Sequence, residues 1–136
     1  MAILFPSDEW VKAAMIELNQ STDYKEAAKT WEGDIEFVVT ALPDGRKEVV
    51  LYMDLWHGTC REAYEVSEPK SKPEFTILAP LPVWRKVLGG KLDPIRGLVS
   101  RQLKMRGNMM KVMKAPKAAV ELVNSCARVE TEWPGS

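Results

Sequence analysis

The sequence predicts an α+β fold in which strands occupy the middle of the chain and helices precede and follow them. Apolar residues recur at helical spacing before Gly33, and they alternate along successive runs between Asp34 and Ala79. Helical spacing returns after Leu81, with one further alternating run at residues 102–106. These changes of period, separated by Gly, Pro and Asn, predict five strands and several short helices.

The length and composition indicate one globular domain. The chain has 136 residues, the usual size of a domain with one core, so we expect residues 1–136 to form a single unit. Hydrophobic residues make up 46% and charged residues 28%, which is typical of globular proteins. The sequence has no apolar run near the roughly 18 residues of a membrane-spanning helix and no signal-peptide pattern. We therefore expect a cytoplasmic protein.

Two helices are predicted at the start. Ser7 is followed by Asp8 and Glu9, a pattern typical of a helix N-cap with acidic residues at its positive end. A second helix is expected to begin at Ser21 or Thr22, to carry residues as far as Trp31, and to end at Gly33.

Three strands joined by tight turns follow. The run 34–40 places Ile35, Phe37 and Val39 on one face. Pro43-Asp44-Gly45 is a turn, and the run 48–56 then places one set of apolar residues on one side, Val49, Leu51, Met53 and Leu55. His57-Gly58 makes a second turn into a strand over 59–66. Short turns between strands predict an antiparallel meander.

The second half mixes short helices with two more strands. We expect a loop from Ser67 to Lys72, a strand over 74–79, and a helix that contains Trp84, Val87 and Leu88 and stops at Gly89-Gly90. Asp93-Pro94 predicts another helix start, and residues 102–106 a fifth strand. Asn108 is a candidate N-cap for a methionine-rich helix, in which Pro116 predicts a kink or a break into two helices.

Catalytic and metal-binding patterns are absent from the sequence. His57 lies in a predicted turn with no second ligand or nucleophile near it, and Cys60 and Cys126 have no metal-ligand spacing. The chain has no HExxH helix, no GxSxG elbow and no P-loop. We therefore expect a non-enzymatic protein without cofactor or metal, in which both cysteines are reduced core thiols.

Charge is distributed unevenly although its sum is zero. Residues 1–83 contain fifteen Asp and Glu and eight Lys and Arg, whereas the segment from Trp84 to Lys117 contains ten basic residues and one acidic residue, Asp93. This segment has few aromatics and no nucleic-acid-binding motif, so we do not expect nucleic-acid binding. Its charge predicts weak, reversible docking to an anionic membrane surface. The alternatives are a solvated face, or contact with the acidic half of a second subunit in a homodimer.

The stretch from Glu74 to Lys114 resembles the sterol carrier protein (sterol-transfer) domain family. The resemblance rests on two motifs at a fixed spacing, Gly90-Lys91-Leu92-Asp93-Pro94 and Leu103-Lys104-Met105-Arg106-Gly107-Asn108-Met109. It implies an α+β fold with a five-stranded, mostly antiparallel sheet covered by helices, and an apolar lipid tunnel between the layers. It also implies non-catalytic binding or transfer of a fatty-acid-like, acyl-CoA-like or sterol-like ligand.

An alternative function is an interaction or substrate-presenting accessory module for a lipid-metabolising enzyme. Failure of the purified protein to carry or bind any lipid would favour this alternative.

The expected lipid site combines residues from both layers. Flexible methionine side chains adapt to irregular partners, which suits a pocket that closes around different lipids, although methionines also fill gaps in an ordinary core. We expect the first two strands, the helix that contains Trp84, and the methionine-rich segment to form the wall, with ten ligand-binding residues: Phe37, Val39, Leu51, Met53, Leu55, Trp84, Leu88, Met105, Met109 and Met113.

Overall fold

The structure, a computed structural model, describes residues 1–68 and 72–135. In chain order its elements are β1 (Ile3–Leu4), α1 (Asp8–Gln20), α2 (Thr22–Ala27), β2 (Glu32–Thr40), β3 (Glu48–Trp56), β4 (Thr59–Glu65), β5 (Phe75–Pro80), α3 (Leu81–Leu88), α4 (Pro94–Val99), β6 (Lys104–Arg106), α5 (Met109–Met113), α6 (Pro116–Cys126) and β7 (Thr131–Glu132).

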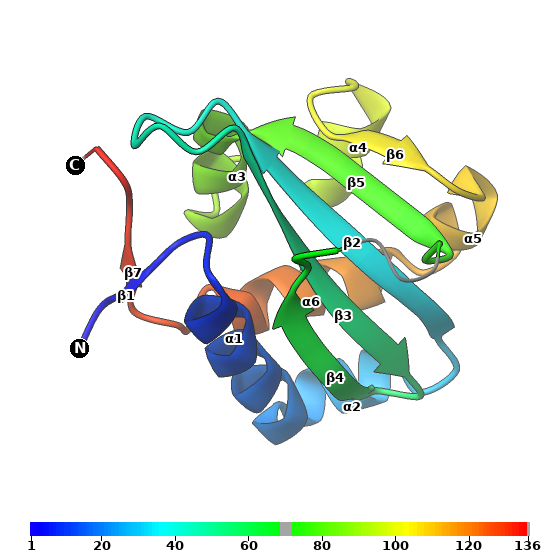
Figure 1. Cartoon of the computed structure of the whole chain (residues 1–136). Helices are drawn as coiled ribbons and strands as arrows, with labels where there is room; N and C mark the ends of the chain where they lie inside the picture. Colours follow the sequence, from blue (N-terminus) through cyan, green and yellow to red (C-terminus); the bar gives the residue numbers. More distant parts are fainter. Residues whose placement is uncertain (69–71, 136) are drawn as a thin grey trace.

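The main sheet has five strands in the order β4-β3-β2-β5-β6. The strands β2, β3 and β4 form the predicted antiparallel meander, while β5 pairs parallel with β2 and antiparallel with β6. Three of the four strand pairings are therefore antiparallel, as the sequence predicts. The helices pack against one face of this sheet, and α6 runs behind its centre (Figure 1).

The alternation along β3 separates an interior face from an exterior face. Val49, Leu51, Met53 and Leu55 are all buried, and the residues between them reach the other side of the sheet. The bounds of this strand and its interior face agree with the prediction. Because successive side chains of a strand point to opposite sides, one buried face also determines the pairing register.

The helix starts follow the predicted capping residues. The Ser7 hydroxyl accepts a hydrogen bond from the backbone N–H of Trp10 at 3.0 Å. Asp93 and Asn108 accept equivalent bonds at the starts of α4 and α5. Pro116 begins α6, so the methionine-rich stretch forms two separate helices, one of the two arrangements expected.

The prediction is wrong at the end of the second helix. Helix α2 ends at Ala27, so Trp31 lies outside it, and Gly33 belongs to β2 instead of ending a helix. The Trp31 carbonyl accepts a hydrogen bond from the backbone N–H of His57 at 2.7 Å, and its indole donates to the Gly33 carbonyl at 3.0 Å. These two hydrogen bonds hold Trp31 beside the first residues of β2, outside helix α2. Of the predicted loop over 67–72, residues 69–71 lie outside the described residues.

The two ends of the chain pair with each other, which the sequence did not predict. Strands β1 and β7 are parallel, with the Ile3 N–H donating to the Glu130 carbonyl at 2.8 Å. The Trp10 indole donates to the Thr131 hydroxyl at 2.9 Å, and the Phe5 and Trp133 rings lie 5.1 Å apart. This terminal clasp, residues 3–5 with 130–133, closes one end of the helical layer.

Within the described residues, no helix is long and apolar enough to cross a membrane.

Candidate functional site: two adjoining apolar cavities

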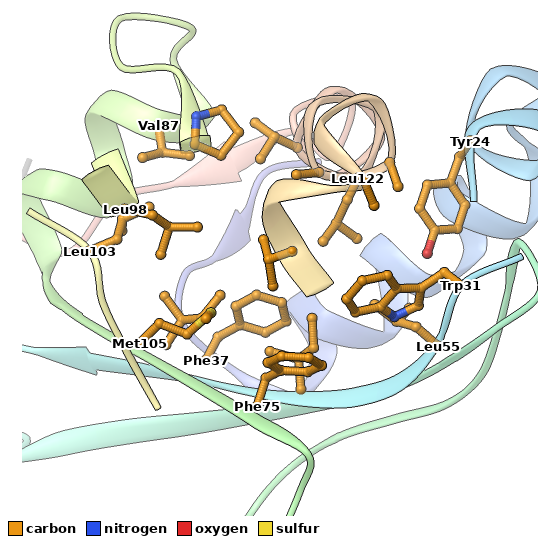
Figure 2. A pocket seen from close by; sticks show the side chains of 18 of the residues that line it. Tyr24, Trp31, Phe37, Leu55, Phe75, Val87, Leu98, Leu103, Met105 and Leu122 are labelled. Carbon is orange, nitrogen blue, oxygen red and sulfur yellow. The ribbon is translucent and has the colours of Figure 1, made fainter. Parts of the chain in front are cut away.

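A first cavity of about 80 Å³ lies between the sheet and the helices. Figure 2 shows side chains that converge on it from the strands and from the helical layer. Phe37 and Phe75 belong to the sheet, whereas Leu98 and Leu122 belong to α4 and α6. A water needs roughly 10–15 Å³ of such space, so this volume exceeds that of a few buried waters. An almost wholly apolar wall gives water few partners and favours an apolar occupant.

A second cavity of about 50 Å³ adjoins the first beneath α1 and α3. Its wall includes Phe5 and Trp10 from the N-terminal region and Leu51 and Met53 from β3. Five residues border both cavities and form the partition between them: Phe37, Trp84, Val87, Leu122 and Val123.

Trp84 is the fixed member of this partition. Its indole N–H donates to the carbonyl oxygens of Val38 at 3.1 Å and Ala79 at 3.0 Å. Its ring meets Phe37 edge to face, with centroids 5.9 Å apart. A buried indole with a satisfied N–H holds its position. The other four partition side chains have no polar group and no such bond.

The structure places seven of the ten predicted site residues around the two cavities. Phe37, Leu55, Trp84 and Met105 border the first cavity, and Phe37, Leu51, Met53, Trp84 and Leu88 border the second. The remaining three line neither of these cavities. Val39 is buried in the core, and Met109 and Met113 are half-buried against it.

Helix α6 contributes more to the wall than the sequence interpretation assigned to it. Ala118, Leu122 and Val123 of this helix border the first cavity, as do Tyr24 and Phe75 from elsewhere in the chain. The helical spacing of Val123 and the alternation around Phe75 were visible in the sequence. Neither signal says which buried residues border free space.

One hydroxyl and two thiols lie at the α2 end of the site. Tyr24 is 2% exposed and borders the first cavity, and burial raises its pKa above the usual value of 10. Burial also raises the pKa of each thiol, Cys60 and Cys126, to about 12. Both cysteines are free and buried, as predicted. All three groups are therefore uncharged at neutral pH.

A basic surface groove of about 550 Å³ shares one lining residue, Leu88, with the second cavity. Arg85, Lys86 and Lys91 also line the groove. The Arg85 guanidinium lies over the Trp133 ring, 5.4 Å from its centroid. Leu88 thus separates apolar interior from positively charged surface.

His57 lies apart from both cavities. Its imidazole is half exposed, contacts the Glu32 carboxylate and stacks on Trp56 with ring centroids 5.0 Å apart. It has a positive φ of 49°, consistent with the predicted tight turn.

The helix-covered sheet and its apolar interior define a class of α+β domain that can enclose a small apolar ligand. The sequence profile of the SCP-2 sterol transfer family matches residues 13–119, and the chain belongs to this family. No curated protein matches the sequence significantly.

Solved structures agree with this assignment. A sterol carrier protein 2 crystal structure is 34% identical with a TM-score of 0.81, and the match covers 90% of this chain and 97% of that one. A conserved hypothetical protein from Thermus thermophilus is 35% identical with a TM-score of 0.82, over 91% and 88% of the two chains.

A more distant similarity concerns the fold alone. A sec-alkylsulfatase from Pseudomonas sp. is 14% identical with a TM-score of 0.55, and the match covers 92% of this chain but 16% of that one.

Proposed function

We propose that the protein binds an apolar lipid in the two cavities and transfers it, without catalysing a reaction. The ligand is fatty-acid-like, acyl-CoA-like or sterol-like. The observation that carries this proposal is the pair of adjoining apolar cavities between the two layers of the fold. Each ligand methylene that leaves water contributes about 0.8 kcal/mol, so a dozen buried carbons give substantial affinity before any head-group contact.

A long lipid needs the two cavities to become one. Separate volumes of about 80 and 50 Å³ are small beside the roughly 150 Å³ of an engineered cavity that holds benzene. Trp84 is held by two hydrogen bonds, so movement of Phe37, Leu122 and Val123 is the route by which the partition opens. A ligand that occupies both cavities would separate these side chains.

Lipid carriage can be tested on the purified protein and on a cavity-filling variant. Native mass spectrometry, followed by organic extraction, identifies any lipid that co-purifies. Ala118 is 7% exposed on α6 and borders the first cavity, so Ala118→Leu places a larger side chain in the ligand's path. We expect this variant to bind a fluorescent fatty acid about four- to fifteen-fold more weakly than the wild type, by loss of the contacts of one or two methylenes.

Ala13→Leu is the matched control for that variant. Ala13 lies on α1 and borders neither cavity, so the same enlargement there leaves fatty-acid affinity unchanged. Urea unfolding of both variants verifies that each remains folded. Wild-type affinity in a folded Ala118→Leu variant would contradict the assignment of the cavity as the lipid site.

The basic groove supports a second part of the proposal, docking to an anionic membrane. Arg85, Lys86 and Lys91 line the groove, and Leu88 borders both the groove and the second cavity, so a lipid that leaves past Leu88 meets positive charge. Basic residues near an anionic surface contribute on the order of 1 kcal/mol each, and the attraction decays within a Debye length. Docking through such a groove is weak and reversible.

A vesicle-transfer assay tests the docking. We expect the double variant Lys86→Glu/Lys91→Glu to slow transfer of a fluorescent lipid from anionic vesicles by about tenfold or more at low salt, as at least about 2 kcal/mol of attraction is lost. Transfer from neutral vesicles should not change. The control variant Lys25→Glu/Lys29→Glu reverses two exposed charges on or next to α2. Equal effects of both double variants, or no dependence on salt, would contradict docking through the groove.

The accessory-module function is favoured by one observation, the presence of this fold within a much longer sulfatase chain. Protein that is purified empty and binds no fluorescent lipid would favour this function over lipid transfer.

A further inference from the structure

We infer that the Tyr24 hydroxyl hydrogen-bonds an uncharged oxygen of the bound lipid, such as an alcohol or a carbonyl group. This inference deepens the proposed lipid binding and depends on it. It assigns a polarity to the buried end of the ligand and a specificity-determining role to one side chain.

Tyr24 is a deeply buried side chain whose polar atom reaches cavity space. The residue is 2% exposed, and its side chain extends from α2 along the first cavity (Figure 2). The backbone N–H of Tyr24 donates to the Ser21 hydroxyl at 3.1 Å, which fixes the start of α2. Backbone capping and burial together hold the phenol in place.

The hydroxyl has no hydrogen-bond partner within residues 1–68 and 72–135. Every side-chain nitrogen or oxygen that is completely buried in this part of the chain does have a partner. The Tyr24 oxygen, which has no partner there, is therefore not completely buried, and it faces the space of the first cavity. A buried hydroxyl without a partner is costly, and phenylalanine would fill the same place without that cost. The unpaired hydroxyl thus indicates an occupant that supplies the missing bond.

The surroundings determine what that occupant is. None of the described residues that line the first cavity is charged, and the thiols near Tyr24, Cys60 and Cys126, are neutral because burial raises the pKa of each. A carboxylate or phosphate at this depth would be an uncompensated buried charge. The basic groove lies instead beyond the second cavity, next to Leu88. An uncharged oxygen suits the Tyr24 end, and an anionic group suits the groove end.

The test compares two small probes that differ by one hydroxyl in place of one methyl group, benzyl alcohol and ethylbenzene. Each is titrated into ¹⁵N-labelled wild type and Tyr24→Phe, and the dissociation constants are read from amide chemical shifts. The difference in hydration between the probes is the same for both proteins, so it cancels when the ratio of the two constants is compared between wild type and Tyr24→Phe. We expect the relative preference for benzyl alcohol to fall about tenfold in Tyr24→Phe, as one neutral hydrogen bond is lost.

Tyr52→Phe is the matched control. The Tyr52 hydroxyl lies on the exterior face of the sheet and donates to the Asp34 carboxylate at 2.9 Å, so its removal leaves the probe preference unchanged. The same two variants also differ in urea unfolding. Tyr24→Phe should keep or raise the stability of the protein, because it removes an unpaired hydroxyl, whereas Tyr52→Phe should lower it.

The outcomes separate this inference from the proposed function. If both probes bind the wild type and Tyr24→Phe does not change their ratio, the hydroxyl has no part in recognition and lipid binding stands. If Tyr24→Phe lowers stability as Tyr52→Phe does, the hydroxyl has an internal partner and the inference is wrong. If neither probe binds the wild type, the cavity itself does not accept apolar ligands, and the proposed function is wrong along with the inference.

Discussion

The two faces of the central sheet come from the same alternating strands but are organised in different ways. On the exterior face, polar groups are matched in pairs: Tyr52 donates to Asp34, and the Arg61 guanidinium holds Asp54 at 3.0 Å. On the interior face, Leu51 and Met53 are each 1% exposed, yet the second cavity lies beside them. An ample supply of apolar residues therefore does not guarantee a filled core. The space depends on how the helices fit over the sheet.

The largest expected difference between the two faces is the free energy of unfolding that is lost when a strand side chain is truncated to alanine. Leu51→Ala removes a fully buried side chain beside an existing cavity and should lower the free energy of unfolding by about 2–5 kcal/mol. Val50→Ala, the adjacent truncation on the exterior face, should cost less than about 1 kcal/mol. Urea unfolding of both variants measures the difference. Equal losses would mean that the two faces are equally packed and would contradict the comparison.

A smaller change in stability, of opposite sign, is expected when the charge of an exterior carboxylate, Glu36, is removed. Burial, reinforced by the negative charge of Asp34, raises the pKa of Glu36. A carboxyl with a raised folded-state pKa destabilises the fold when it is ionised, and this penalty disappears as the pH falls below its pKa in the unfolded chain. Glu36→Gln should therefore stabilise the protein at pH 7 by a few tenths of a kcal/mol, after allowance for screening by solvent.

The pH dependence provides the check on that variant. The gain should vanish below about pH 4, where Glu36 is protonated in both folded and unfolded wild type. Urea midpoints of wild type and Glu36→Gln at pH 7 and at about pH 3 provide the measurement. A gain that persists unchanged at the lower pH would show that the charge of Glu36 is not its cause.

Most elements could be predicted because their signals are local. The bounds of β3 follow from alternation between two turns, and the caps at Ser7, Asp93 and Asn108 follow from side chains that satisfy nearby backbone N–H groups. The terminal clasp was missed because each of its strands has two residues, too few for a pattern. Its pairing depends on contacts that span almost the whole chain.

The site was predictable only in part, because free space is a property of packing. The sequence favoured the methionines of α5, but Lys111 binds this helix to the end of the sheet through Glu74 at 2.6 Å. Pro116 then starts α6 as a separate helix, whose Ala118 and Leu122 border the first cavity. The small Ala118 leaves room that no apolar pattern reveals. The role proposed for Tyr24 likewise depends on the lack of a hydrogen-bond partner for its hydroxyl among the described residues, which only three-dimensional geometry shows.

The terminal clasp also indicates that the chain could be circularly permuted without a change of fold. Because the Phe5 N–H bonds to the Glu132 carbonyl at 2.9 Å, a short linker between the two ends would join segments that are already neighbours. New ends could be opened at Gly45, an exposed turn residue at which a Cβ atom would meet nothing within 4 Å. A circular permutant of this design would keep both cavities and the basic groove. Lipid carriage would then be a property of the assembled layers, independent of where along the chain synthesis begins.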